Sequence, residues 1–144
     1  MKHLPWALAA LLFAVSAAAN GLTVSAPWVR VMPGDLPCGG YFTLENGSDQ
    51  DVTLIGASVP DFARAMLHNS VSENGVEKMV PVDRVTVPAH GEIRFQPGGY
   101  HVMLMKRRHS LSIGDTVPVT LRFADGRTVE ASFKLRGPAA MGAE

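Results

Sequence analysis

Short runs of β-branched, aromatic and aliphatic residues recur along this chain, and residues typical of turns separate them. Alternation of polar and apolar side chains is clearest in residues 128–135, which we interpret as an edge-like strand with one solvent-exposed face. Asp125-Gly126, a strong hairpin signal, joins this run to the run before it. The expected strands cover residues 28–32, 40–45, 52–59, 63–71, 76–80, 92–96, 101–105, 117–123 and 128–135. Many short strands separated by turns predict an all-β sandwich or barrel.

A second hairpin is expected at Asn74-Gly75, the strongest short-range signal for a two-residue turn. Such a turn would place Met79 opposite Ser70 and His68 opposite Pro81. Met79 and His68 would then be diagonal neighbours on one side of the ribbon, close enough for both side chains to reach a common ion. A three-residue loop would break this parity, so the prediction depends on the turn type.

The first nineteen residues have the pattern of an export signal. Lys2 and His3 form a short polar start, an apolar stretch follows at residues 6–15, and residues 17–19 are three alanines suited to a cleavage site. We expect cleavage near Ala19 and a mature chain that is periplasmic. A transmembrane anchor is the alternative, but the apolar run is short for a span, so no stable membrane insertion is expected.

About 125 residues remain after such a cleavage, enough for one domain with one core. We expect this domain to cover residues 20–136 and residues 137–144 to form a disordered tail. Without Lys2 the chain has 12 basic and 13 acidic residues, which disfavours a nucleic-acid-binding surface. Cys38 is the single cysteine, so no internal disulfide forms and stability must come from burial.

Candidate chemistry lies in the run at residues 101–105, because His101 and Met103 are two residues apart on an expected strand and therefore share one face. An imidazole and a thioether aimed at one point suit a soft metal ion. Thioether sulfur is a good ligand for Cu(I) and a poor one for Zn²⁺, Mg²⁺ or Ca²⁺. Taken singly, a strand methionine is more often core filler and a histidine more often a half-buried polar group.

Four such residues occur at fixed spacings: ten residues separate His68 from Met79, twenty-one separate Met79 from His101, and one separates His101 from Met103. This pattern resembles the metal motif of the PCuAC family of periplasmic copper chaperones at every spacing. The similarity covers essentially the whole mature chain, and its other parts are Ala26-Pro27-Trp28-Val29-Arg30, Asn74-Gly75-Val76 and the segment 97–105.

The resemblance implies a cupredoxin-like Greek-key β-sandwich that binds one Cu(I) per monomer through His68, Met79, His101 and Met103. It also implies a non-enzymatic metallochaperone that delivers copper to the copper A centre of cytochrome c oxidase. The expected partners are the copper-binding subunit of that oxidase and a Sco-type thiol protein, and we expect the chaperone to be a monomer. Some relatives carry a Met/His-rich C-terminal extension for Cu(II), but this tail has only Met141.

Other soft or titratable residues are weaker candidates. Met66 shares an alternation phase with His68, and Met105 shares one with Met103, but core packing is the favoured interpretation of both. Cys38 is interpreted as buried filler at a position where the family commonly has a small residue. His90 and His109 are expected in solvated turns, and the basic run 106–109 is expected to be a solvated loop that could steer an acidic partner.

Two other functions use related chemistry. A blue-copper electron carrier needs a cysteine close to histidine and methionine ligands, usually on one C-terminal loop, whereas Cys38 is far upstream. Copper buffering or resistance would use the same site without a dedicated acceptor. An enzyme is disfavoured because no nucleophile elbow, zinc helix or paired-carboxylate pattern is present in the sequence.

Overall fold

The computed structural model describes residues 17–19 and 21–144. The regular secondary structure in these ranges consists of β-strands alone. They are β1 (Ala17–Ala19), β2 (Leu22–Arg30), β3 (Cys38–Asn46), β4 (Val52–Ser58), β5 (Phe62–Glu73), β6 (Val76–Pro81), β7 (Val85–Val87), β8 (Glu92–Phe95), β9 (Tyr100–Arg107), β10 (Thr116–Phe123) and β11 (Thr128–Arg136). The predicted all-β, cupredoxin-like fold class is confirmed. No helix in the described ranges has the length and apolar character needed to cross a membrane.

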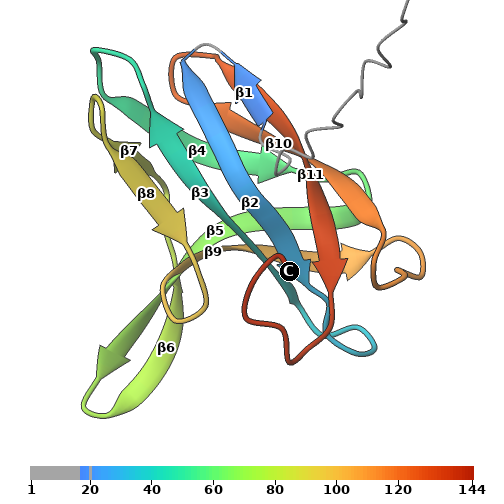
Figure 1. Ribbon diagram of the computed structural model, residues 1–144. Helices are drawn as coiled ribbons and strands as arrows, with labels where there is room; N and C mark the ends of the chain where they lie inside the picture. Colours follow the sequence, from blue (N-terminus) through green and yellow to red (C-terminus); the bar gives the residue numbers. More distant parts are fainter. Residues whose placement is uncertain (1–16, 20) are drawn as a thin grey trace, which may run out of the picture.

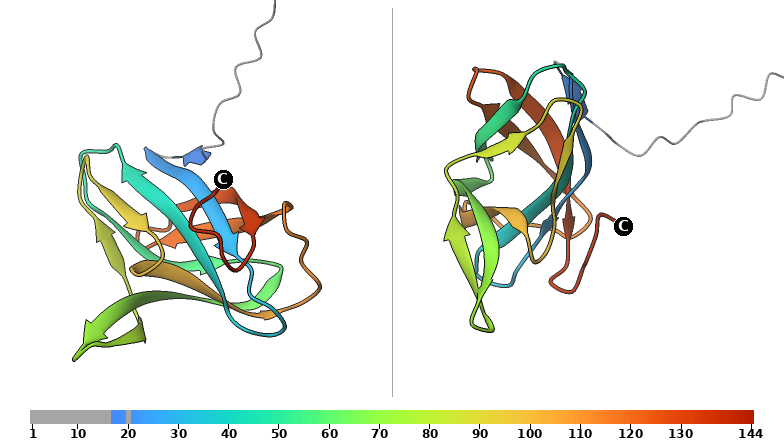
Figure 2. Two further views of the ribbon diagram at one scale, coloured as in Figure 1. Left: turned by 60° about the horizontal axis from the view of Figure 1, so that its bottom comes forward. Right: turned by 90° about the vertical axis from the view of Figure 1, so that its left-hand side faces the viewer.

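The strands form one hydrogen-bonded sheet in the order β6-β5-β9-β8-β3-β2-β11-β10-β4-β7, with β1 added to β2 and β9 also paired to β3. The sheet folds over on itself, so that β5 and β9 cross behind β2, β3 and β11 (Figures 1 and 2). The β5–β6 hairpin extends away from this body (Figure 1). β4 and β5, near opposite ends of the strand order, pack against each other and help to enclose the core.

The core is filled by the inward residues of the alternating strands. In β11, every second side chain is buried, from Val129 to Leu135, as the alternation predicts. The largest side chains with no appreciable exposure are Phe133, Leu22, Leu44, Leu54, Leu104, Leu121 and Leu135. The hydrophobic effect of burying these aliphatic and aromatic groups therefore stabilises the fold without a disulfide.

Three features differ from the expectations. The prediction that residues 128–135 form an edge strand is wrong, because β11 lies between β10 and β2. β2 begins at Leu22 rather than at residue 28, since a bulge at Ala26 (φ 49°) lets the strand continue past Pro27. β7 is a three-residue strand paired to β4, too short to show an alternation of its own.

The expected export signal lies mostly outside the described residues, and its last three alanines form β1 beside β2. The signal and its cleavage near Ala19 stay predictions. The C-terminal segment 137–144 turns back toward β2, where the Arg30 guanidinium donates to the Ala140 carbonyl from Nε (3.2 Å) and Nη2 (2.7 Å). The expected disorder of this segment also stays a prediction.

Candidate metal centre

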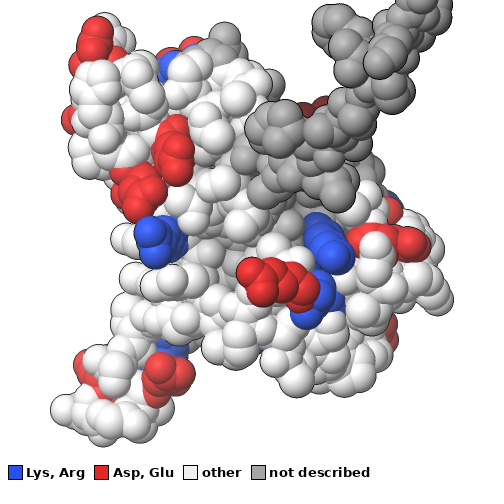
Figure 3. All heavy atoms as spheres, viewed as in Figure 1, with Lys and Arg blue, Asp and Glu red and all other residues white. Residues whose placement is uncertain are grey.

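The β5–β6 hairpin has the predicted two-residue turn. Asn74 and Gly75 both have positive φ, 51° and 78°, the conformation that tight hairpin turns of this kind require. Ser70 pairs with Met79 and His68 with Pro81, so the predicted register is confirmed. On the face that Figure 3 shows, charged groups of the hairpin lie toward its tip, and the surface at its base is mostly uncharged.

Strand β9 lies on the other side of β5 and brings the two histidines together. His68 pairs directly with His101, and Met66 pairs with Met103. The two imidazole rings stack with their centroids 5.7 Å apart and their planes inclined by 22°. Because opposed residues of an antiparallel pair share a face, all four side chains lie on one face of the sheet.

Backbone carbonyls orient both imidazoles. Nδ1 of His101 is 3.1 Å from the Gly99 carbonyl oxygen, and Nδ1 of His68 is 3.5 Å from that of Met66. A carbonyl only accepts, so Nδ1 is the donor in each contact, and Nε2 is the ring nitrogen that each imidazole has left for a metal. This arrangement is the one found in metal-ligating histidines, where a hydrogen bond from one nitrogen orients the other toward the metal.

His101 is only 4% exposed, and its Nε2 is the one buried side-chain nitrogen or oxygen in residues 17–19 and 21–144 without a hydrogen-bond partner. Buried polar atoms are normally paired, so an orphaned one is a candidate functional atom. Burial lowers the pKa of His101 below 6.5, with a smaller lowering from His68, although the Gly99 carbonyl acts in the opposite direction. His101 is therefore neutral at pH 7 and able to donate its lone pair.

A hollow of about 300 Å³ collects most of the predicted site. Met79, His101 and Met103 all line it, and Met79 is 62% exposed, which leaves its thioether accessible from solvent. His68 does not line the hollow and is connected to it by the stack on His101. The four predicted ligands thus lie in one region, and their binding of a metal stays a prediction. The remaining lining residues are Arg30, Met32, Leu36, Pro37, Cys38, Gly39 and Tyr41.

An aromatic wall, which sequence reasoning missed, supports the histidine pair from the side of β3 and β2. The ring centroid of Tyr41 lies 6.3 Å from that of His101 and 4.8 Å from that of Trp28. The Arg30 guanidinium carbon is 5.6 Å from the ring centroids of both Trp28 and Tyr41. Burial raises the pKa of Tyr41 despite the nearby Arg30 charge, so the phenol stays protonated.

Gly39 makes room for this wall. It pairs with Met103, and a Cβ atom added to it would lie 2.7 Å from the Tyr41 hydroxyl oxygen, so the ring occupies the space that any side chain at this position would need. The signal that could have revealed the wall is the pairing of β3 with β9, which the sequence alone does not give.

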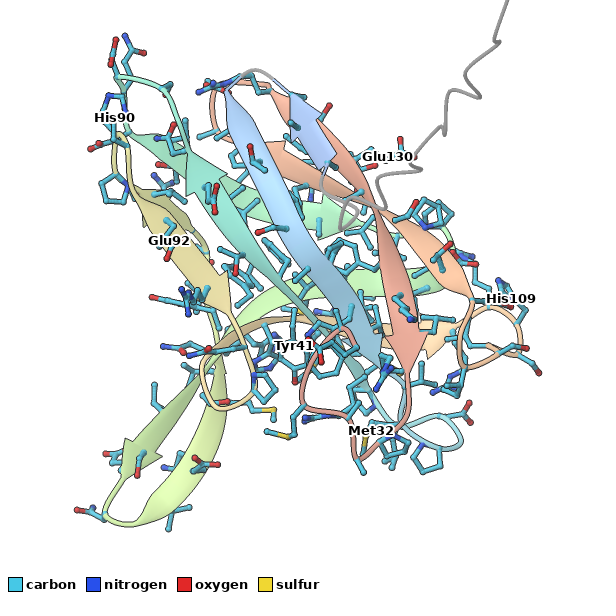
Figure 4. All side chains as sticks on the ribbon, viewed as in Figure 1. Met32, Tyr41, His90, Glu92, His109 and Glu130 are labelled. Atoms are coloured by element: carbon cyan, nitrogen blue, oxygen red, sulfur yellow. The ribbon has the colours of Figure 1, made fainter. Side chains whose placement is uncertain are left out.

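The weaker candidates fall as follows. Met66 and Met105 do not line the hollow. Cys38 is buried opposite Leu104, on the core face of β3, and it also lines the hollow. His90 pairs with Asp49 (2.7 Å) and His109 with Asp61 (2.6 Å), both at the exposed surface and far from each other (Figure 4).

The expectation that the basic run 106–109 is a solvated loop is wrong for its first half. β9 continues to Arg107, whose Nη2 donates to the Met32 carbonyl at 2.6 Å. Lys106 has a φ of 57°, a left-handed conformation that is uncommon for a residue with a side chain.

Within residues 17–19 and 21–144, no group of three or more His, Cys, Asp or Glu side chains is placed to hold a metal ion. The candidate centre is therefore a pair of imidazoles accompanied by thioethers. Such a donor set favours soft, monovalent metal ions over hard cations that require oxygen ligands.

Comparison with known proteins gives both family and fold. The model of the family named putative lipoprotein LpqE-like matches residues 22–135. Among curated proteins, the chain is 32% identical over 111 residues to putative lipoprotein Lxx21020 of Leifsonia xyli, covering 76% of this chain and 66% of that protein. It is 31% identical over 86 residues to the uncharacterized protein RP573 of Rickettsia prowazekii, covering 59% of this chain and 48% of that protein. The aligned parts thus span two thirds or less of these relatives.

Solved structures with the same fold include PCuAC domains. The apo PCuAC domain of PmoF2 superposes with a TM-score of 0.73 at 24% identity, over 89% of this chain and 99% of that one. Apo-DR1885 from Deinococcus radiodurans gives a TM-score of 0.63 at 33% identity, over 95% of this chain and 93% of that one. The Cu(I) form of DR1885 gives 0.58 at 35% identity, over 88% and 83% of the two chains.

The family model covers most of the chain, and the fold is that of PCuAC domains, so the resemblance drawn from the sequence motif is confirmed. The chain belongs to the LpqE-like family of PCuAC-type proteins.

Proposed function

We propose that this protein is an exported metallochaperone that binds one Cu(I) through His68, Met79, His101 and Met103. The observation that carries the proposal is the buried, unpartnered Nε2 of His101, in a residue that lines a hollow together with the thioethers of Met79 and Met103. The structures of copper-bound relatives support it: one shows the PCuAC domain of PmoF2 with copper, and another shows DR1885 with Cu(I).

The donor set suits a carrier outside the cytoplasm. Thioethers have no proton to lose and form no disulfides, so they stay available in an oxidising compartment where paired thiolates would cross-link. Neutral donors also hold Cu(I) less tightly than thiolates do, which favours release to an acceptor. Met79 is the exposed member of the set, so an acceptor can approach the ion from its side.

We propose delivery to the copper A centre of cytochrome c oxidase in the periplasm, alongside a Sco-type thiol protein, with the chaperone acting as a monomer and not as an enzyme. Copper buffering is the alternative and uses the same site. A blue-copper electron carrier is disfavoured: Cys38 also lines the hollow, but its side chain is buried and its Sγ accepts hydrogen bonds from the Met32 N–H and from Arg107 Nη2.

Two measurements test the proposal in sequence. Competition with a chromogenic Cu(I) chelator is expected to give one ion per chain, and Zn²⁺ in the same range is expected to bind far more weakly. Transfer is then followed by mixing the loaded protein with the isolated copper A domain. If the copper A domain takes up Cu(I) faster from the loaded protein than from a Cu(I)–chelator complex, the result supports delivery. If the protein binds Cu(I) but does not transfer it, the result supports buffering.

Copper affinity is expected to fall as the pH is lowered. Protons compete for the imidazole lone pairs, so affinity is constant at high pH and decreases below the pKa values of the unbound ligands. Burial lowers the pKa of His101, so its part of the decrease begins below about 6.5, the usual histidine value. Two imidazoles allow a slope of at most about two decades per pH unit. Chelator competition between pH 7.5 and 5 measures this slope, and a flat profile would contradict imidazole ligation.

Cys38→Ala is expected to cost stability without changing the copper stoichiometry. Its Sγ accepts from the Met32 N–H (3.5 Å) and from Arg107 Nη2 (3.3 Å), and the side chain is fully buried. Losing both contacts and the sulfur is expected to lower the free energy of unfolding by about 1–2 kcal/mol. Denaturant unfolding and Cu(I) titration of the same sample check both parts. Loss of the metal would show Cys38 to be a ligand.

A further inference from the structure

A third thioether, that of Met32, lines the hollow of the candidate metal centre. Met32 follows β2, and Figure 4 labels it in the lower part of the view, below Tyr41. The side chain is partly buried and lines the hollow together with Met79, His101 and Met103. Sequence reasoning gave Met32 no role beyond a place in a strand.

The backbone of Met32 is held on both sides. Its N–H donates to Cys38 Sγ (3.5 Å), and its carbonyl accepts from Arg107 Nη2 (2.6 Å). Cys38 begins β3 and Arg107 ends β9, which are the strands that carry Gly39 and Met103. The same two strands that shape the hollow therefore also fix the position of Met32 at its edge.

The order of strands places sulfur on both sides of the ligand strand. Met79 is on β6, at one end of the sheet, His101 and Met103 are on β9, and Met32 follows β2, which pairs with β3 on the far side of β9. A Cu(I) ion bound in this hollow would therefore have a further neutral sulfur in the lining of the hollow when it loses the exposed Met79. If one thioether binds as another leaves, the Cu(I) ion keeps its number of ligands throughout the exchange.

We propose that Met32 is a further Cu(I) contact that replaces Met79 when the ion is released on the β6 side, and that Arg107 and Cys38 are positioning residues for it. This inference rests on the proposed function. Met32 needs no deprotonation to bind, and its soft sulfur selects the same metal as the other thioethers. The contact would keep the ion at His101 and Met103 while an acceptor occupies the place of Met79.

The test is a double-mutant cycle with Cu(I) as the probe. Met32→Leu alone is expected to lower affinity less than about threefold, because leucine keeps the apolar volume and Met79 is still present. If Met32 replaces Met79, the Met32→Leu/Met79→Leu protein is expected to bind at least about tenfold more weakly than the product of the two single effects predicts. Met105→Leu combined with Met79→Leu is the matched control and is expected to be additive.

Methyl NMR of the methionine side chains gives a direct readout. In Met79→Leu, addition of Cu(I) is expected to shift the Met32 and Met103 methyl signals and to leave that of Met105 in place. Arg107→Gln is expected to reduce the Met32 shift, whereas Arg108→Gln, at an exposed neighbouring residue, is not. Additive affinities with an unmoved Met32 signal would overturn this inference alone. Failure of the unmodified protein to bind Cu(I) would overturn the proposed function and this inference together.

Discussion

Met103→Leu is expected to leave the fold intact and to weaken Cu(I) binding by more than the 10–100-fold that loss of an outer-shell partner typically costs. Leucine closely matches the volume and apolarity of methionine, so a large change in packing is not expected. What disappears is the sulfur, on a side chain that lines the hollow two residues beyond His101, whose Nε2 has no hydrogen-bond partner. A soft ion would then lose one of its neutral donors.

Met105→Leu is the control for this prediction. Met105 is two residues further along β9, on the same face, and is likewise partly buried, but it does not line the hollow. Chelator competition on both variants and the unmodified protein gives the comparison, and unfolding curves verify that both are equally stable. Equal Cu(I) affinity in all three proteins would place the metal elsewhere.

The local geometry of the site could be predicted from the sequence because it depends on short-range rules. The Asn74-Gly75 turn determines the parity of β5 against β6, and strand alternation determines which of two neighbouring side chains share a face. The partners His68 and Met79, and likewise His101 and Met103, were placed correctly within their own strands. Their convergence was inferred from the family resemblance rather than from strand pairing.

Long-range pairing could not be predicted in the same way. The direct opposition of His68 and His101 depends on β5 and β9 meeting antiparallel, and nothing local in either strand specifies that partner. The aromatic wall depends on a second pairing, of β3 with β9, and on a glycine that leaves space for the Tyr41 ring. Met32 was missed for the same reason, since Arg107 reaches it from a position 75 residues away in the chain.

The mistaken edge assignment of β11 has a related cause. A strand with one solvated face and one buried face has the same alternation whether it lies at the edge or in the middle of a sheet, because the pattern reports its faces and not its neighbours. β11 pairs with β10 through a short turn and with the distant β2 in parallel. Only the second, non-local partner distinguishes the two arrangements.

Phe133→Ala is expected to lower the free energy of unfolding by about 3–5 kcal/mol, the largest stability effect of the substitutions considered. Phe133 is fully buried on β11, and its ring lies edge-on to that of Phe42 with the centroids 5.6 Å apart. It also packs close to Gly40, next to the glycine that pairs with Met103. Truncation would leave a cavity beneath the strand that supports the site, because neighbouring strands can close over it only in part.

Thermal and denaturant unfolding of the purified protein measure this loss, and the melting temperature is expected to fall by roughly 10–20 °C. Lys134→Ala, at the exposed neighbouring residue on β11, is the control and is expected to change stability by no more than about 0.5 kcal/mol. A loss below about 1 kcal/mol for Phe133→Ala would mean that the core repacks freely around this position. Below its melting temperature the variant is still expected to bind Cu(I), because Phe133 lies on the core side of the sheet and its removal deletes no ligand.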